Sequence, residues 1–143
     1  MHQVSKDVKE FFAAYERGLA SSDLSIIGTS YADSFLFAGP QGAQAVTREG
    51  FLKALPRRQG FFETVGLSST KITSLEETRL DEHYLSVKVG WVMRFAKDPQ
   101  HPIENENSAT YILQQQEQGL RIVFQLDHQD LMKKVQELGL LKP

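Results

Sequence analysis

The segment from His83 to Phe95 restricts the fold most strongly, because apolar side chains alternate along it with polar or small ones. The apolar set consists of Leu85, Val87, Val89, Trp91, Met93 and Phe95. The intervening set consists of Tyr84, Ser86, Lys88, Gly90, Val92 and Arg94. A period of two is typical of a strand in an antiparallel sheet with one covered face. The sequence therefore predicts a half-buried sheet with a second layer packed on it.

Further strands are predicted on both sides of this segment. The stretch Leu80–Glu82 is a plausible hairpin turn to a preceding strand. After a polar connection, a turn at Glu117–Gly119 separates two more strands. A short apolar run earlier in the chain leads into Gly39 and Pro40. The predicted strands besides His83–Phe95 are Phe35–Phe37, Lys71–Arg79, Ser108–Gln115 and Leu120–Leu126.

The first part of the chain has helical periodicity. Ser5 can cap a helix whose apolar residues recur at spacings of three and four, namely Val8, Phe11, Phe12, Tyr15 and Leu19. A second, shorter helix is expected after Ser21, running through Leu24 and Ile27 to Tyr31.

Two more helices are predicted later in the chain. Thr47 precedes a helical pattern that Pro56 is expected to interrupt or kink. Asp127 is expected to cap a closing helix from Asp130 to Leu138, which stops at Gly139. Helices followed by a long run of strands predict an α+β layer fold, with the helices on one face of a curved, mostly antiparallel sheet and a short C-terminal helix.

Composition places the chain in the class of single globular domains, here residues 1–143. It has 143 residues, of which 41% are hydrophobic and 24% charged. With no cysteine, disulfides and thiolate chemistry are excluded. A net charge of −2 with scattered basic residues predicts no nucleic-acid or membrane partner. The polar N-terminus has no apolar stretch of a signal peptide, which favours a cytoplasmic location.

The order of these elements, with the Tyr31-Ala32-Asp33 motif, Phe35 and the Gly39-Pro40 turn, resembles the nuclear transport factor 2-like superfamily. The resemblance covers nearly the whole chain and implies a cone-shaped α+β fold. Members include ketosteroid isomerase, scytalone dehydratase, polyketide cyclases and limonene epoxide hydrolase, as well as binding and scaffold domains without chemistry. Because catalytic groups are placed on this scaffold independently, the resemblance alone implies no activity.

A residue-by-residue comparison with ketosteroid isomerase argues against that reaction. In this resemblance Tyr15 takes the place of the oxyanion-hole tyrosine and Tyr31 that of a supporting tyrosine. Gly39 takes the place of the catalytic aspartate, and glycine has no side chain that could act as a base. The strand around Ala109–Leu113 contains no acid to serve as the second oxyanion donor, and the third tyrosine is lost near Ala54 or Leu55. No catalytic residue is assigned.

The candidate ligand-binding residues are mostly aromatic. They are Tyr15, Tyr31, Phe37, Trp91, Tyr111, Phe124 and His128. His128 keeps the parity of Leu120, Ile122, Phe124 and Leu126, so we expect it on the inward side of the last strand, where a histidine could exchange a proton near neutrality. For Tyr15, Tyr31, Trp91 and Tyr111 the alternative interpretation is a packing residue, and for His128 it is a hydrogen bond to a backbone carbonyl. Arg57 and Arg58 could clamp a carboxylate or phosphate, or they could lie at a solvated helix end.

Metal ligands are not expected. The pairs His128 with Asp130 and Glu104 with Glu106 have suitable residue types, but no further ligand pattern supports them. No cofactor is predicted either.

Two functional hypotheses follow. In the first, a cone pocket lined by the candidate residues binds a small apolar or aromatic metabolite, with or without a simple acid–base reaction. In the second, the cone is filled by its own side chains and the domain serves dimerisation or protein interaction. In either case the outward residues of the sheet, among them Lys88, Val92, Arg94, Val123 and Gln125, predict a homodimer through the sheet.

Overall fold

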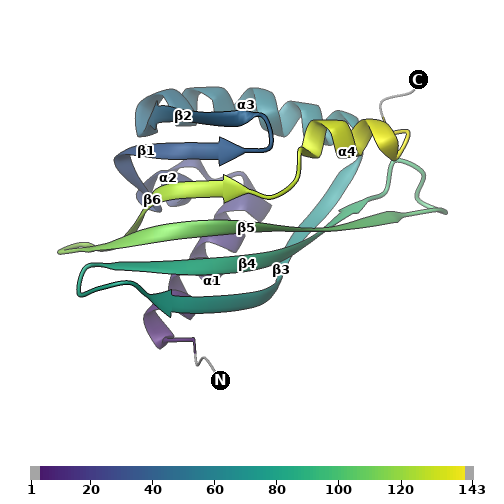
Figure 1. The fold of residues 1–143 in the computed structure, drawn as a ribbon. Coiled ribbons are helices and arrows are strands. Elements are labelled where there is room, and N and C mark those ends of the chain that lie inside the picture. The colour runs from purple at the N-terminus through teal and green to yellow at the C-terminus, as the bar shows by residue number, and fades with distance from the viewer. Residues whose placement is uncertain (1–3, 141–143) are drawn as a thin grey trace.

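The computed structural model describes residues 4–140. In this part of the chain three helices lie over one face of a curved sheet, and a fourth helix follows the last strand (Figure 1). In chain order the elements are α1 (Lys6–Ser21), α2 (Leu24–Thr29), β1 (Tyr31–Gly39), β2 (Gly42–Thr47), α3 (Arg48–Thr64), β3 (Leu67–Arg79), β4 (Tyr84–Phe95), β5 (Ile103–Gln116), β6 (Gly119–Asp127) and α4 (Leu131–Glu137).

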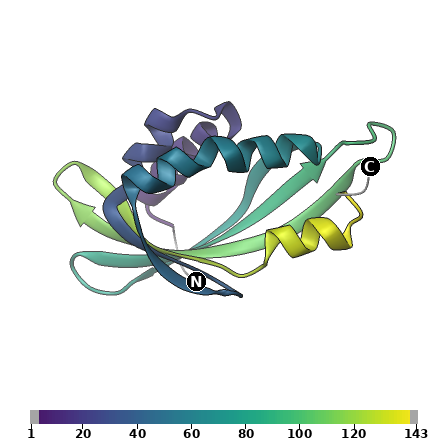
Figure 2. The ribbon, with the colours of Figure 1, turned by 90° about the horizontal axis from the view of Figure 1, so that it is seen from above.

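The six strands form one sheet in the order β2-β1-β6-β5-β4-β3. All neighbouring strands are antiparallel except β1 and β6, which are parallel. Seen from above, the sheet curves beneath α1, α2 and α3 (Figure 2). The α+β fold class, the mostly antiparallel curved sheet and the short C-terminal helix are therefore confirmed.

The helix starts follow the capping residues in the sequence. The hydroxyl of Ser5 accepts a hydrogen bond from the backbone N–H of Val8, and that of Thr47 accepts one from Gly50. Such bonds satisfy N–H groups that have no partner inside the helix. The predicted starts of α1 and α3 are confirmed. The expected interruption at Pro56 is wrong, because α3 continues through it to Thr64.

Three local predictions need correction. Tyr31 does not end a helix but is the first residue of β1, since α2 stops at Thr29. The strand β2 was not expected from the sequence, and its side chains are nearly all exposed, so no buried face marks it. Asp127 belongs to β6, and the helix cap of α4 is Asp130, whose carboxylate accepts a hydrogen bond from the N–H of Lys133.

The alternating face of β4 is buried as predicted. Each of its six apolar residues is at most 5% exposed, whereas the intervening residues are half-buried or exposed. These residues contribute to two separate core clusters. The larger includes Val8 and Phe12 of α1 packed on β4, β5 and β6, and the smaller joins Phe62 of α3 to Val135 of α4.

Candidate functional site

A cavity of about 460 Å³ lies between the helices and the concave face of the sheet. Its walls include members of both core clusters, among them Tyr15, Trp91 and Tyr111 from the larger cluster and Phe62 and Met93 from the smaller. The cavity therefore separates the two cores. Its volume falls in the range of small-molecule sites, about 300–1,000 Å³.

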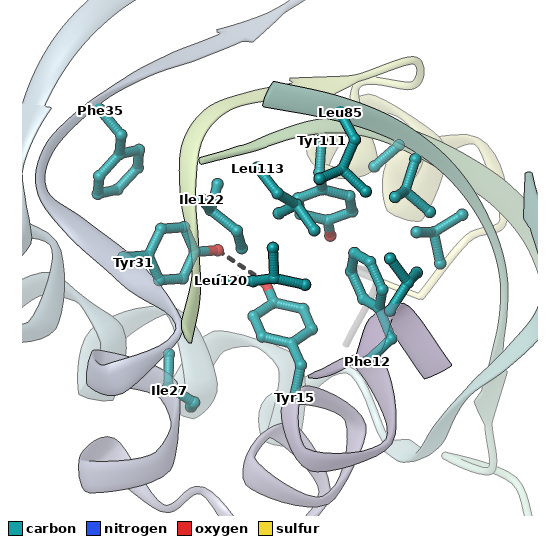
Figure 3. Packing of buried hydrophobic residues seen from close by; sticks show 14 of the residues in the cluster. Phe12, Tyr15, Ile27, Tyr31, Phe35, Leu85, Tyr111, Leu113, Leu120 and Ile122 are labelled. Carbon is teal, nitrogen blue, oxygen red and sulfur yellow. Dashed lines mark hydrogen bonds between the residues drawn. The ribbon is translucent and has the colours of Figure 1, made fainter. Parts of the chain in front are cut away.

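A chain of hydrogen bonds crosses the inner end of this cavity. The hydroxyl groups of Tyr15 and Tyr31 are 2.7 Å apart (Figure 3). The Tyr31 hydroxyl donates to Oε1 of Gln125 at 2.6 Å. Nε2 of Gln125 then donates to Oδ1 of Asp127 at 3.1 Å. All four residues line the cavity. Hydrogen bonds thus link the phenol of Tyr15 in α1, through β1, to the carboxylate of Asp127 in β6.

Burial sets the protonation of the tyrosines. It raises the pKa of Tyr15 above its ordinary value, and hydrogen bonds with Tyr31 and Tyr111 act against this rise. Burial also raises the pKa of Tyr31 and that of Tyr111 well above the ordinary value. All three phenols are therefore neutral near pH 7, where they can donate and accept hydrogen bonds but do not act as bases.

Aromatic rings surround the Tyr15 side chain. Its ring centroid lies 6.0 Å from that of Tyr31, 6.1 Å from Trp91 and 5.8 Å from Tyr111. Tilted and edge-on rings at these separations attract one another and hold their positions. Phe37 adds a half-buried ring to the same cavity wall. The structure thus brings together five of the seven candidate residues: Tyr15, Tyr31, Phe37, Trp91 and Tyr111.

Phe124 lies on the opposite side of the sheet, so its expected inward orientation is wrong. It pairs with Ile112, whose neighbours Tyr111 and Leu113 are the buried, inward residues of β5. The cause is an irregularity in the pairing, where Leu113 opposes Ile122 and Ile112 opposes Phe124, leaving Val123 as an extra residue. One extra residue in a strand reverses the faces of all residues after it.

The same reversal moves His128 out of the interior. Its Nε2 is 2.7 Å from Oγ1 of Thr110, in an exposed contact on the outer face. His128 is exposed and is not among the residues that line the cavity. Gln125, expected on the outer face, is instead buried, at 6% exposure. The alternation of inward and outward residues along β6 is as predicted up to Ile122 and is reversed beyond it.

Several polar residues of the cavity were not predicted from the sequence, among them Gln125, Asp127 and Asn107. Gln125 and Asp127 face inward because of the extra residue, which no sequence signal marks. Asn107 of β5 also lines the cavity, and its Nδ2 is buried without a hydrogen-bond partner among residues 4–140. A buried amide donor without a partner is costly unless another molecule satisfies it. Asn107 could have been found by parity, because it alternates with Ala109 and Tyr111.

Gly39 ends β1 and pairs with Gly42 across the turn. The residues before it are in register with β6, where Ala38 pairs with Leu126. A Cβ atom built on Gly39 would lie 3.7 Å from the backbone oxygen of Asp127. Position 39 therefore lies next to the cavity. The carboxylate that lines the cavity here is that of Asp127 in β6, and β1 contributes none.

A second cavity of about 780 Å³ adjoins the first, between α3, the β1–β2 turn and the start of α4. Arg57 lines this second cavity, and Arg58 lines both. Both arginines are exposed. The expectation of solvated side chains is thus correct, but the two arginines do not end a helix, because α3 continues to Thr64.

The described residues contain neither a metal-binding cluster nor a membrane-spanning helix. Across positions 4–140, no three His, Cys, Asp or Glu side chains come close enough together to hold a metal ion. In the same range, no helix has both the length and the apolar character needed to cross a membrane.

Comparisons with known proteins agree with this architecture. A family model described as NTF2-like protein (DUF6841) matches residues 2–130. No curated protein matches the chain. Among solved structures, an NTF2-like protein of unknown function from Shewanella oneidensis is 15% identical, with 86% of this chain and 97% of that chain covered and a TM-score of 0.70.

Two further solved structures are similar in fold. Aln2 from a Streptomyces species is 13% identical, with 93% of this chain and 98% of that chain covered and a TM-score of 0.74. An NTF2-like protein with a cystatin-like fold from Novosphingobium aromaticivorans is 13% identical, with 96% of this chain and 88% of that chain covered and a TM-score of 0.71. Identities this low support the fold alone.

Proposed function

Since the chain belongs to the NTF2-like protein family DUF6841, we propose that its interior binds a small metabolite that is mainly apolar or aromatic. The observation that carries this proposal is the cavity of about 460 Å³, which has aromatic walls and a polar chain at its inner end. Apolar walls with a few converging polar groups are what small-molecule sites require. The family and the fold do not themselves specify the ligand.

The polar groups of the cavity define what the ligand should carry. Nδ2 of Asn107 is a donor without a partner among residues 4–140, so it suits a ligand carbonyl or hydroxyl oxygen. Asp127 receives a hydrogen bond at Oδ1 from Gln125 and can accept another from a ligand hydroxyl or amine. We therefore expect an aromatic or alicyclic compound with one acceptor group and one donor group.

The alternative is a domain whose interior is filled and which only dimerises or contacts another protein. The cavity favours the ligand-binding hypothesis over this alternative, because a filled interior would leave no space beside Trp91 and Tyr111. An acid–base reaction remains part of the proposal through Asp127, the carboxylate of the hydrogen-bonded chain, since the tyrosines stay neutral near pH 7 and Gly39 carries no base.

Native mass spectrometry of the purified protein tests this function. We expect a population with added mass equal to a small organic molecule, which denaturation releases. The binding of small aromatic compounds should then be measured by calorimetry on protein freed of that molecule. A protein that carries no added mass and binds none of a broad set of aromatic compounds would contradict the proposal.

A homodimer through the outer face of the sheet, in the cytoplasm, also belongs to the proposal. The reversed end of β6 places Phe124 and Leu126 on this face beside Ile112 and Thr110, which makes the face more apolar than the sequence suggested. Light scattering at micromolar concentration should give the mass of two chains, and Ile112→Lys should give the mass of one. A monomeric natural protein would count against the dimer.

A further inference from the structure

The two cavities border each other, and the residues that they share include a cation. The shared residues are Phe37, Arg58, Phe62, Asp127, Gln129 and Leu131. Arg57, one position earlier in α3, lines the second cavity. Two guanidinium groups from consecutive positions of one helix thus face the space between α3, the β1–β2 turn and α4.

Among the described residues, neither arginine is paired with an acidic group. Within residues 4–140, no carboxylate lies within 4.0 Å of the guanidinium of Arg57 or Arg58. By contrast, Arg48 at the start of the same helix is paired with Asp33 at 2.9 Å. The guanidinium carbon of Arg58 lies 5.4 Å from the centre of the Phe62 ring, a stacking contact that orients the side chain.

The charge of Arg58 also acts on the inner cavity. It lowers the pKa of Tyr15 and that of Tyr31, although burial has the larger, opposite effect on both. The positive charge of Arg58, where the two cavities meet, therefore favours negative charge at the hydroxyl groups of Tyr15 and Tyr31. Exposure to solvent keeps the guanidinium accessible to a ligand that enters from the second cavity.

The acidic residues nearby restrict where an anion can lie. Both oxygens of Asp130 are occupied, one by the N–H of Lys133 and the other by Nε2 of Gln41. Asp127 borders both cavities and repels an anion placed beside it. Glu63 and Glu16 line the first cavity only, and Glu16 accepts a hydrogen bond from the N–H of Ile72. Glu63 belongs to α3 but does not line the second cavity, so an anionic group is favoured beside Arg57 and Arg58, on the second-cavity side of the junction.

From these contacts we propose that the ligand is an aromatic carboxylic acid, whose ring lies against Trp91 and Tyr111 and whose carboxylate pairs with Arg58, with Arg57 adding to the positive field. The inference rests on the proposed function and names the ligand class of the same site. A planar guanidinium fork matches the two oxygens of a carboxylate better than any other cationic side chain. The stacking of Arg58 on Phe62 holds that fork where the two cavities meet.

Matched acids and amides test the proposal. Phenylacetic acid and naphthylacetic acid should be titrated by calorimetry together with phenylacetamide and naphthylacetamide, which have the same shape without the charge. A hydrogen-bonded ion pair predicts that the acid with the higher affinity binds about ten- to hundredfold more tightly than its own amide. In Arg58→Gln this preference should fall to about twofold or less, because the acid loses more affinity than the amide.

Two variants serve as controls. Lys53→Gln removes one positive charge from the same helix, at a residue that lines neither cavity, and should keep the preference for the acid. Arg57→Gln should lower the preference by less than Arg58→Gln. Equal affinities of acid and amide in the natural protein would overturn this inference and leave the proposed function standing. Failure of both acids and both amides to bind would contradict the proposed function, and this inference with it.

Discussion

The hydroxyl of Tyr15 donates a hydrogen bond to the hydroxyl of Tyr31, because the single hydroxyl proton of Tyr31 is given to Gln125. The two phenols are therefore not equivalent, although both are buried in the same cluster. Removing the Tyr31 hydroxyl leaves a donor and an acceptor without partners. Removing the Tyr15 hydroxyl leaves an unused lone pair on Tyr31 and takes one hydrogen-bond partner from Tyr111, while Gln125 keeps its donor.

We expect Tyr31→Phe to destabilise the fold more than Tyr15→Phe. Buried polar groups left without partners cost about 1–3 kcal/mol, whereas loss of one net hydrogen bond costs about 0.5–1.5 kcal/mol. The free energy of unfolding in urea measures both. An equal loss of unfolding free energy in both variants, or a larger loss in Tyr15→Phe, would show that Tyr15 does not donate to Tyr31 in the way described.

Stability should fall at high pH because of the buried tyrosines. Burial raises the pKa of Tyr15, Tyr31 and Tyr111 in the folded state above the ordinary value of 10.0, which applies to the unfolded chain. A raised pKa contributes stability that is complete below pH 10 and is lost as the pH rises through the folded-state pKa. Each such phenol steepens the fall by about 1.4 kcal/mol per pH unit.

Unfolding free energies between pH 8 and about pH 11.5 test this prediction. The Tyr111→Phe variant should lose less stability per pH unit above pH 10 than the natural protein. Tyrosinate absorbance should rise sharply on alkaline unfolding. Identical slopes in the two proteins would contradict the burial of a neutral phenol at position 111.

The turn after α3 depends on glycine at position 66. Gly66 has φ of +86°, and an added Cβ would lie only 2.6 Å from the backbone nitrogen of Lys97. Gly66→Ala should therefore destabilise the protein by about 2 kcal/mol or more, from a strained backbone and a steric clash. Thermal unfolding measures the change.

Gly60 provides the matched control. It lies within α3, and no atom is within 4 Å of an added Cβ. Gly60→Ala should raise stability by about 0.5–1 kcal/mol, because alanine favours a helix. A mild effect of Gly66→Ala, similar in size to that of Gly60→Ala, would show that the turn can relax.

The reversed end of β6 predicts which side chains matter for binding. Gln125 and Asp127 line the cavity, whereas Phe124 and His128 do not. Asp127→Asn should change the affinity for a ligand that carries a hydroxyl or amine by about tenfold, as expected for a hydrogen bond to a charged group. His128→Ala should leave that affinity within about twofold. The opposite result would mean that the residues keep the simple alternation predicted from the sequence.

Much of the fold could be read from the sequence, because the period of two in β4 and the spacing of three and four in α1 each describe a buried face. The same alternation located Trp91 and Tyr111 on the cavity wall. Ser5 and Thr47 marked helix starts because their hydroxyls satisfy the first N–H groups of a helix. These patterns depend only on residues close together in the chain, so they can be recognised in a single sequence.

The extra residue in β6 could not be predicted, because the pairing with β5 decides it and Val123 itself is an ordinary strand residue. That one residue moved Phe124 and His128 outward and brought Gln125 and Asp127 inward. The β2 strand was also missed, because an exposed edge strand has no apolar alternation. Tertiary pairing therefore determined the part of the site that sequence periodicity assigned wrongly.

The most direct test of the ligand-binding cavity is to fill it. Ala109 is 4% exposed and lies in the cavity wall, so Ala109→Phe should place a ring in the space where the ligand is expected. Titration of naphthylacetamide should be followed by calorimetry in the natural protein and in Ala109→Phe, with unfolding curves to establish that the variant is folded. Ala109→Leu provides a smaller substitution for comparison. We predict binding to the natural protein, weaker binding to Ala109→Leu and none to folded Ala109→Phe. Equal binding to all three, or binding to none, would contradict a ligand site in this cavity.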